Sequence, residues 1–289
     1  MSRLLVTGAA GQLGQDLLRL EPGALGIDLA ELDLTDGLAV RAFLAADKPE
    51  VVIHGAAYTA VDKAEADEER AYLVNATASA HLATACAAVG ARLVAVSTDY
   101  VFAGDATEPY EPTDEPAPRS AYGRTKLAGE LAVREILPGS SHVVRSAWVW
   151  GAGGVNIVKT VVRLEATRET VSFVDDQRGS PTWSRDLAAG LLELAGRPDV
   201  PAGILHATGG GETTWFGFAG AIFTELGADP GRVLPTTTET LKLPAPRPAY
   251  SVLSPRAWIE AGLTPLPHWR EALHTAFADP EVAAALRPS

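Results

Sequence analysis

The first half of the chain alternates short, continuously apolar runs with longer, alanine-rich segments of helical character. The apolar runs occupy residues 3–7, 24–28, 51–56, 92–98 and 141–147. Helical patterns begin near Gly11 and Ser120 and also cover residues 37–46 and 68–90. Short apolar strands separated by helices indicate parallel pairing with both faces of the sheet covered. The pattern therefore predicts an α/β fold built on a Rossmann-type, doubly wound parallel sheet.

The second half of the chain has a looser pattern. Residues 155–167 and 184–196 look helical, residues 170–175 and 203–208 look like strands, and residues 241–255 are rich in proline. We expect residues 1–150 to form the first domain. Residues 151–289 should form mainly a smaller C-terminal lobe, with some elements returning to the first domain.

Residues 105–119 form a separate segment between the fourth predicted strand and the helix that begins near Ser120. Five acidic residues and four prolines leave this segment without helical or strand periodicity. We expect a surface loop, which is either a plain solvated connection or a rim over a site, since loops beyond strand ends line ligand crevices in such folds.

A glycine pattern, Gly8, Gly11 and Gly14, joins the first strand to the first helix. A tight strand-to-helix turn needs residues without a Cβ, and the unpaired N–H groups of the helix N-terminus attract an anion. Three glycines could also serve only a structural turn. Their position in the first βα turn of an α/β chain favours a dinucleotide site.

Asp28 ends the second predicted strand, 20 residues after Gly8. An acidic side chain at this place can accept hydrogen bonds from the hydroxyls of an adenosine ribose, and it would repel a 2′-phosphate. The alternative is an acidic residue in a surface turn, because the surrounding sequence is rich in acids.

Tyr122 and Lys126 lie four residues apart in a predicted helix and therefore share one face. An ammonium group beside a phenol favours the phenolate and is expected to lower the pKa of Tyr122 toward useful proton exchange. Alone, the pair could be an exposed tyrosine packed on a lysine stem. Ser97 and Thr98 end the fourth strand 24 residues earlier, at the sheet edge where a substrate would lie.

These features together resemble the extended short-chain dehydrogenase/reductase family. The wording is most similar to its dTDP-4-dehydrorhamnose reductase branch through "GAAGQLG", "AAYTAVDKAE", "STDYVFAG", "YGRTKLAGE", "RSAWVWG", "NIVKT" and "DDQRGSPT". The resemblance implies that the first domain binds NADPH or NADH and that the second lobe mainly binds a dTDP-linked 4-keto-6-deoxyhexose. The implied reaction is reduction of the C4 ketone of dTDP-4-dehydro-L-rhamnose to dTDP-L-rhamnose.

The resemblance also implies roles for individual residues. Tyr122 would donate the proton, Lys126 would bind the nicotinamide ribose, and Thr98 would polarise the C4 carbonyl. The cofactor-binding residues, together with Tyr122 and Lys126, would be Gly8, Gly11, Gln12, Leu13, Gly14, Asp28, Asp33, Leu34, Ala56, Ala57, Tyr58 and Thr59. The substrate-binding residues would be Val61, Asp99, Tyr100, Trp148 and Arg247. Trp150 is expected to be a core residue.

Two positions depart from the family pattern. Tyr250 stands where the family often has asparagine, which leaves the C-terminal substrate contacts open. Some members form a magnesium-assisted dimer through a glutamate just after the glycine loop, where this chain has Asp16. The shorter carboxylate leaves a Mg²⁺ site and a homodimer open without assuring either, and no metal ligands are assigned.

Charge and cysteine content narrow the class of partner. Lys and Arg number 24 against 36 Asp and Glu, and the net charge of −12 argues against nucleic-acid and anionic-membrane binding. A single cysteine, Cys86, excludes an internal disulfide and suits a reducing compartment. The N-terminus enters a strand pattern without the features of a signal peptide, so we expect a cytoplasmic protein.

Three alternative functions stay open. The chain could reduce a related dTDP-4-keto-6-deoxyhexose of an antibiotic-sugar pathway. It could be a sugar-nucleotide epimerase or dehydratase, although Asp99 is followed by Tyr100 where a dehydratase would want a second acid. It could also resemble the noncatalytic regulatory subunit of methionine adenosyltransferase, which the complete set of Thr98, Tyr122 and Lys126 disfavours.

Overall fold

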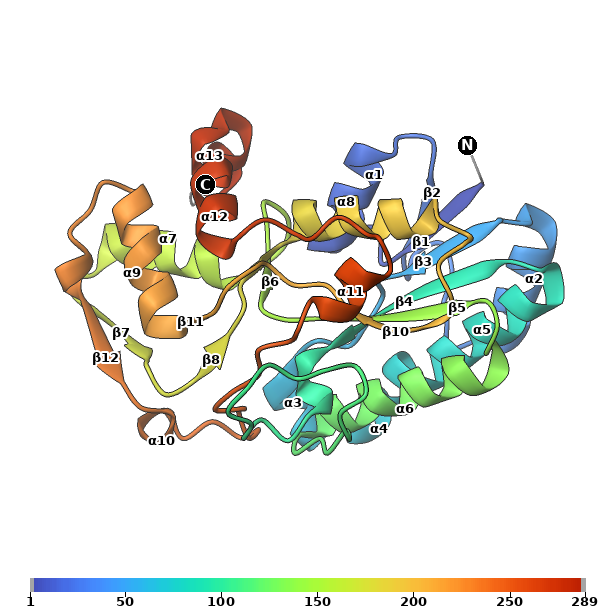
Figure 1. Cartoon of the computed structure of the whole chain (residues 1–289), viewed down its shortest axis with the longest axis horizontal. Helices are drawn as coiled ribbons and strands as arrows, with labels where there is room; N and C mark the ends of the chain where they lie inside the picture. Colours follow the sequence, from blue (N-terminus) through green and yellow to red (C-terminus); the bar gives the residue numbers. More distant parts are fainter. Residues whose placement is uncertain (1–2, 287–289) are drawn as a thin grey trace.

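A six-stranded parallel sheet forms the centre of the computed structural model, which describes residues 3–286 (Figure 1). The strand order is β10-β5-β4-β3-β1-β2. The strands are β1 (Leu4–Thr7), β2 (Leu25–Ile27), β3 (Val51–His54), β4 (Arg92–Thr98), β5 (Ser141–Ser146) and β10 (Gly203–His206). The order reverses between β1 and β3, which makes the sheet doubly wound. The predicted α/β fold class is confirmed.

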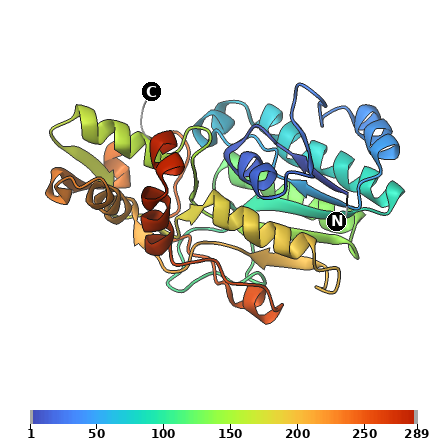
Figure 2. The same ribbon diagram turned by 90° about the horizontal axis from the view of Figure 1, so that it is seen from above.

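Helices cover both faces of this sheet, as the two views show (Figures 1 and 2). One face carries α1 (Gln12–Leu20) and α8 (Ser184–Ala195), and the other carries α2 (Gly37–Asp47), α5 (Ala78–Val89) and α6 (Ala121–Ile136). All residues of β1, β3 and β5 are buried, because apolar side chains on both sides of each strand meet a helix layer.

The helical pattern predicted over residues 68–90 is interrupted rather than continuous. It consists of α4 (Glu68–Tyr72), a π-helical turn (Leu73–Thr77) and α5. The side chain of Asn75 in this turn bonds both the N–H and the carbonyl of Tyr58, at 2.8 and 3.2 Å. A short helix that the pattern did not predict, α3 (Val61–Ala66), precedes this region.

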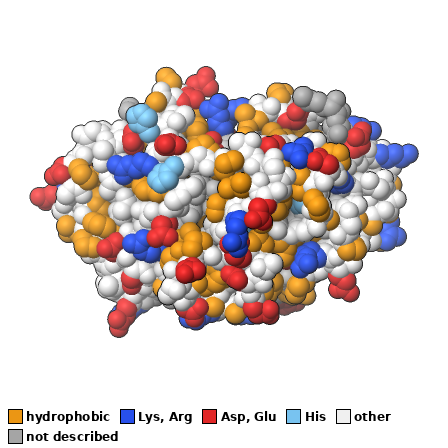
Figure 3. All heavy atoms as spheres, viewed as in Figure 1, with side chains coloured by type: hydrophobic (Ala, Val, Ile, Leu, Met, Phe, Trp, Pro, Cys, Tyr) orange, Lys and Arg blue, Asp and Glu red, His pale blue; other side chains and the backbone are white. Residues whose placement is uncertain are grey.

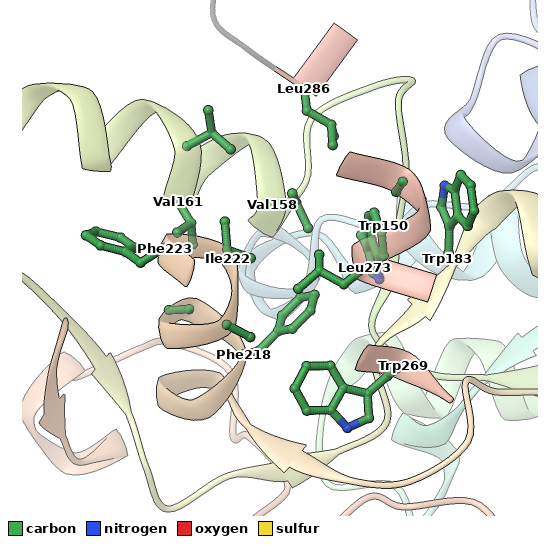
Figure 4. Packing of buried hydrophobic residues seen from close by; sticks show 14 of the residues in the cluster. Trp150, Val158, Val161, Trp183, Phe218, Ile222, Phe223, Trp269, Leu273 and Leu286 are labelled. Carbon is green, nitrogen blue, oxygen red and sulfur yellow. The ribbon is translucent and has the colours of Figure 1, made fainter. Parts of the chain in front are cut away.

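The second lobe is made of short strand pairs and helices around an aromatic core. Its strands pair in twos: β6 (Val149–Trp150) with β9 (Thr182–Trp183), β7 (Val171–Val174) with β12 (Val233–Thr236), and β8 (Arg178–Gly179) with β11 (Thr213–Thr214). Its helices are α7 (Ile157–Thr167), α9 (Trp215–Glu225), α10 (Thr238–Leu241), α12 (Trp269–Ala278) and α13 (Pro280–Leu286). Trp150, Phe218, Phe223, Trp269 and Leu273 pack together at its centre (Figure 4), so the prediction that Trp150 is core is confirmed.

Segments from the second half of the chain return to the first domain. Strand β10 pairs with β5, and α8 packs on α1. After α10 the chain crosses back and forms bridges from Tyr250 to Asp105 and from Leu253 to Tyr110, before α11 (Arg256–Glu260). The 105–119 segment is therefore anchored by the C-terminal region, and its Tyr110 side chain is buried.

Within residues 3–286, no helix has the length and apolar character that crossing a membrane requires. On the face shown in Figure 3, acidic and basic side chains are scattered among hydrophobic ones.

Candidate functional site

The candidate site is a cavity of about 890 Å³ at the carboxyl ends of the central strands. It lies beside the point where the strand order reverses, which is where ligands bind in open α/β sheets. Its volume is at the upper end of the range for ligand pockets, which is roughly 300–1,000 Å³. The cavity runs from Asp28 and Asp33 near β2 to Tyr122 and Trp148 beyond β4 and β5.

The glycine turn between β1 and α1 forms one wall of the cavity. Gly8 has φ +73°, and a Cβ on it would lie 2.7 Å from the Ala56 backbone nitrogen. A Cβ on Gly14 would lie 2.2 Å from the Gly8 carbonyl oxygen. Both positions therefore need glycine, and the backbone at the start of α1 stays open toward the cavity.

The Asp28 carboxylate is hydrogen-bonded to this glycine turn. One of its carboxylate oxygens accepts from the N–H of Ala10 at 2.9 Å, and the other accepts from the N–H of Leu29 at 2.8 Å. Asp28 also lines the cavity. The backbone contacts hold its carboxylate at the end where an adenosine ribose would lie.

Tyr122 and Lys126 project from the first turns of α6 into the cavity. Ser120 caps this helix by accepting from the N–H of Gly123 at 3.1 Å, which fixes where the helix begins. The Tyr122 ring packs edge-on against Tyr100 with ring centroids 5.5 Å apart. The Lys126 Nζ donates to the Val96 carbonyl at 2.8 Å, so the ammonium is anchored to β4.

The electrostatics of this pair differ from the expectation. Burial raises the pKa of Tyr122 to about 12, and the nearby Thr98 hydroxyl opposes this rise only in part. Burial lowers the pKa of Lys126 to about 8, against the opposing effect of Glu130. The prediction that the Tyr122 pKa is lowered is thus wrong, because desolvation of the phenol raises this pKa more than the Thr98 hydroxyl lowers it. Tyr122 is a neutral phenol near pH 7 and carries the proton that a donor needs.

Thr98 and Asp99 are bonded to each other at the end of β4. The Thr98 hydroxyl donates to Asp99 Oδ1 at 2.9 Å and accepts from the Tyr100 N–H at 3.2 Å. Burial raises the pKa of Asp99 to about 6, with the hydroxyls of Ser251 and Thr98 acting in the opposite direction. In this arrangement the Thr98 hydrogen points to Asp99, so Thr98 must turn before it can donate to a substrate oxygen.

The structure brings most of the predicted site residues together around the one cavity. Those that line it are Gly8, Gly11, Gln12, Leu13, Gly14, Asp28, Asp33, Leu34, Ala56, Ala57, Thr59, Val61, Thr98, Asp99, Tyr100, Tyr122, Lys126 and Trp148. Their individual roles stay predictions. Residues 105–119 contribute nothing to the lining, so the idea of a rim over this cavity is wrong.

Tyr58 and Arg247 are predicted site residues that do not line the cavity. The Tyr58 backbone is held by hydrogen bonds to Asn75, and its side chain packs against the cluster of Ala64, Ala71 and Ala121. Arg247 forms an ion pair of 2.8 Å with Asp62 and donates to the Ala245 carbonyl. The Arg247 guanidinium is therefore paired with a carboxylate of α3.

Asp16 is not arranged as a metal ligand. Its carboxylate is buried and accepts from the Ser184 hydroxyl and from Arg19, the latter at 2.6 Å. In the part of the chain from residue 3 to residue 286, no three His, Cys, Asp or Glu side chains gather as a metal site. Asp16 is thus engaged within its own chain, and a magnesium site shared between two chains stays a prediction.

Some cavity residues were not predicted as site residues. Ser146 ends β5, and its strand-end position could have indicated it, as it did for Ser97, which the sequence placed at this sheet edge without a role. Trp215 also lines the cavity, although it lies 67 residues after Trp148 and in another lobe. Ser97 Oγ, Ser146 Oγ and Asp99 Oδ2 are buried at the cavity without a hydrogen-bond partner among the described residues. Three polar atoms without partners, in the same cavity as a glycine turn, fit a large polar ligand such as a dinucleotide.

The doubly wound sheet, its glycine turn and the cavity at the switch point define the class of dinucleotide-binding α/β proteins. Residues 2–281 match the family model described as the RmlD substrate binding domain. The chain belongs to this family.

Several similar proteins span nearly the same length. The chain is 50% identical to a dTDP-4-dehydrorhamnose reductase of Streptomyces griseus, over 95% of this chain and 93% of the relative. It is 46% identical to a dTDP-4-keto-6-deoxy-D-glucose reductase of Streptomyces niveus, over 95% and 96%. The crystal structure of dTDP-4-dehydrorhamnose reductase from Bacillus anthracis in complex with NADP superimposes with a TM-score of 0.92, at 38% identity over 96% of this chain and 99% of that one.

Proposed function

We propose that the chain reduces the C4 ketone of dTDP-4-dehydro-L-rhamnose to dTDP-L-rhamnose with NADPH or NADH. The observation that carries this proposal is the position of Tyr122 and Lys126 in the same cavity as the glycine turn. One end of that cavity offers a site for a dinucleotide, and the other offers a neutral phenol beside strand-end hydroxyls. The similarity to named reductases of this substrate supports the choice of sugar.

In the proposed reaction the reduced nicotinamide supplies the hydride to C4. Tyr122 donates its phenolic proton to the oxygen at C4, and its raised pKa keeps that proton in place until the oxygen becomes basic. Lys126, fixed to the Val96 carbonyl, holds positive charge beside the phenolate that remains. Thr98 turns from Asp99 toward the same oxygen and stabilises its developing charge.

The proposed binding residues divide between the two ends of the cavity. Gly8, Gly11 and Gly14 admit the pyrophosphate, and Asp28 accepts from the ribose hydroxyls. Val61, Asp99, Tyr100 and Trp148 face the sugar. Arg247 would bind the nucleotide diphosphate only after its ion pair with Asp62 has broken.

The decisive experiment replaces the proton donor. Tyr122→Phe should lower kcat by about a thousandfold, because general acid catalysis contributes roughly 10²–10⁴. Dinucleotide binding should persist, since only a hydroxyl is lost. NADPH and NADH oxidation with dTDP-4-dehydro-L-rhamnose measures the first effect, and fluorescence titration of the dinucleotide measures the second. Wild-type turnover in Tyr122→Phe would contradict the assignment.

A second candidate is reduction of a related dTDP-4-keto-6-deoxyhexose, which the 46% identity to a dTDP-4-keto-6-deoxy-D-glucose reductase favours. The two substrates differ in stereochemistry and not in the chemistry at C4. Comparing kcat/KM for both sugars decides between them.

We further propose a cytoplasmic location, because the buried free thiol of Cys86 suits a reducing compartment. We also propose a homodimer, which sedimentation would test.

A further inference from the structure

Trp148 has an unusual backbone conformation. Three non-glycine residues between 3 and 286 have positive φ, and two of them, Lys48 and Lys242, are C-caps of helices, where this conformation is common. Trp148, with φ 48°, ends no helix but lies between β5 and β6 at the cavity. A bulky residue in this region of backbone space is strained, and such strain persists only where the surroundings hold it.

Trp215 is a direct neighbour of Trp148 in those surroundings. The indoles of Trp148 and Trp215 are stacked in parallel, with ring centroids 3.5 Å apart and an interplanar angle of 4°. Trp215 begins α9 of the second lobe, whereas Trp148 follows the last strand of the first half. The stack therefore joins the two parts of the chain at the sugar end of the cavity.

Other contacts fix both rings. Gly179 on β8 lies so close that a Cβ on it would be 2.4 Å from Trp148 Cε2. The Trp215 Nε1 donates to Gln177 Oε1 at 3.0 Å, and Gln177 Nε2 donates to the Thr238 hydroxyl at 2.8 Å. Gln177 is buried, so its amide is a fixed anchor for the Trp215 ring.

We propose that Trp215 is a positioning residue for the sugar: it holds Trp148 in its strained conformation so that Trp148 presents a fixed wall to the substrate. The inference rests on the proposed function only in taking the substrate to be a sugar nucleotide. Trp215 acts through Trp148, and its loss should therefore affect the sugar and leave the dinucleotide end of the cavity unchanged.

The test compares Trp215→Leu with Trp215→Phe. Leucine keeps apolar volume but cannot stack, so the KM for dTDP-4-dehydro-L-rhamnose should rise about tenfold, the size expected for one lost aromatic stacking contact. The KM for NADPH and kcat should stay within about twofold, since Trp148 has no part in the proton transfer. Phenylalanine keeps a ring that can stack and should restore the sugar KM. A sugar KM that Trp215→Leu leaves unchanged, or an equal rise for NADPH, would overturn the inference.

A double-mutant cycle separates action through Trp148 from direct contact. In a Trp148→Leu background, Trp215→Leu should raise the sugar KM no further. An additive rise would show that Trp215 acts on its own and would overturn the inference. Gln177→Leu, which keeps both rings, should raise the sugar KM in the same direction by a smaller factor and serves where Trp215→Leu does not fold.

Failure of the proposed function is a separate result. Wild-type protein that turns over none of the 4-keto sugar nucleotides would contradict the proposed function. The coupling between Trp148 and Trp215 would then be tested by measuring the free energy of unfolding of each variant in the double-mutant cycle. Non-additive effects of Trp148→Leu and Trp215→Leu would support the coupling of the two indoles, and additive effects would overturn it.

Discussion

The interior beside the cavity and the core of the second lobe are stabilised by different means. Beside the cavity, buried polar groups are bonded to each other: Arg145 contacts Glu130 through two nitrogens, and His54 lies between Thr7 and Ser79. The second-lobe core is a cluster of aromatic and aliphatic side chains (Figure 4). Hydrophobic packing suffices where only shape is needed, whereas the reactive side chains require fixed polar neighbours.

The largest expected effect comes from breaking the buried ion pair. Glu130 follows Lys126 by one turn of α6, and Glu130 and Arg145 have side-chain exposures of 3% and 1%. Glu130→Gln leaves the Arg145 charge buried without a counter-charge and should cost about 4 kcal/mol of unfolding free energy. Urea denaturation measures this loss. Replacing both partners, as Glu130→Leu with Arg145→Met, should be close to neutral. A loss below about 1 kcal/mol in the single variant would contradict the expectation that Arg145 is left as a buried charge without a counter-charge.

A smaller effect is expected from the second-lobe core. Phe218 is fully buried among Trp150, Trp215 and Trp269. Phe218→Ala should cost about 3 kcal/mol, because the site keeps a cavity. Its dinucleotide affinity should equal that of the wild type, in contrast to Glu130→Gln, whose lost charge lies next to Lys126. Urea denaturation and fluorescence titration measure the two quantities. A weaker dinucleotide affinity in Phe218→Ala would show that the second-lobe core also affects the cavity, against the difference expected between the two regions.

The smallest expected effect is a dependence of stability on pH. Burial lowers the pKa of His54 to about 3, from its ordinary value of 6.5. Between these values the unfolded chain binds more protons than the folded chain, so stability is lost as the pH falls below about 6.5. At pH 5.5 this loss is about 1.4 kcal/mol from His54 alone.

The control for this effect is His54→Gln, which cannot titrate. The difference in unfolding free energy between pH 7.5 and pH 5.5 should shrink by about 1.4 kcal/mol in this variant. Burial also lowers the pKa of His206 to about 3, so a pH dependence of the same sign remains. An unchanged difference would mean that His54 is not the group that titrates.

The sequence predicts the central sheet well because its signals are local. Continuous apolar runs mark β1, β3, β4 and β5, and the glycine turn and the Tyr122–Lys126 spacing can be read within a few residues. The two-residue strands of the second lobe were missed, since periodicity cannot be seen over that length. Strand β12 was also missed, although it has four residues. Asn75 in the π-helical turn contacts Tyr58, 17 residues away, and no local pattern in the sequence shows such a contact.

The sequence predicted which residues form the candidate site better than it predicted their pKa values and ion pairs. The family resemblance placed Thr98, Tyr122 and Lys126 together, and the cavity contains all three. The raised pKa of Tyr122 depends on how much protein surrounds the phenol, and the Arg247–Asp62 pair joins residues 185 positions apart. Trp215 escaped prediction for the same reason, because its partner Trp148 belongs to another part of the chain. The catalytic and binding roles of these residues stay predictions.

Strand β10 has a consequence for how this chain can be recombined with its relatives. It pairs with β5 along residues 203–206, so the boundary between the two halves of the sequence does not follow a boundary in hydrogen bonding. A fragment that stops at residue 150 would leave one side of β5 with open backbone N–H and C=O groups, a template for aggregation. Chimeras meant to exchange substrate specificity should therefore keep α8 and β10 with the host's sheet and exchange only second-lobe segments that lie before α8 and after β10, such as β7 and α9.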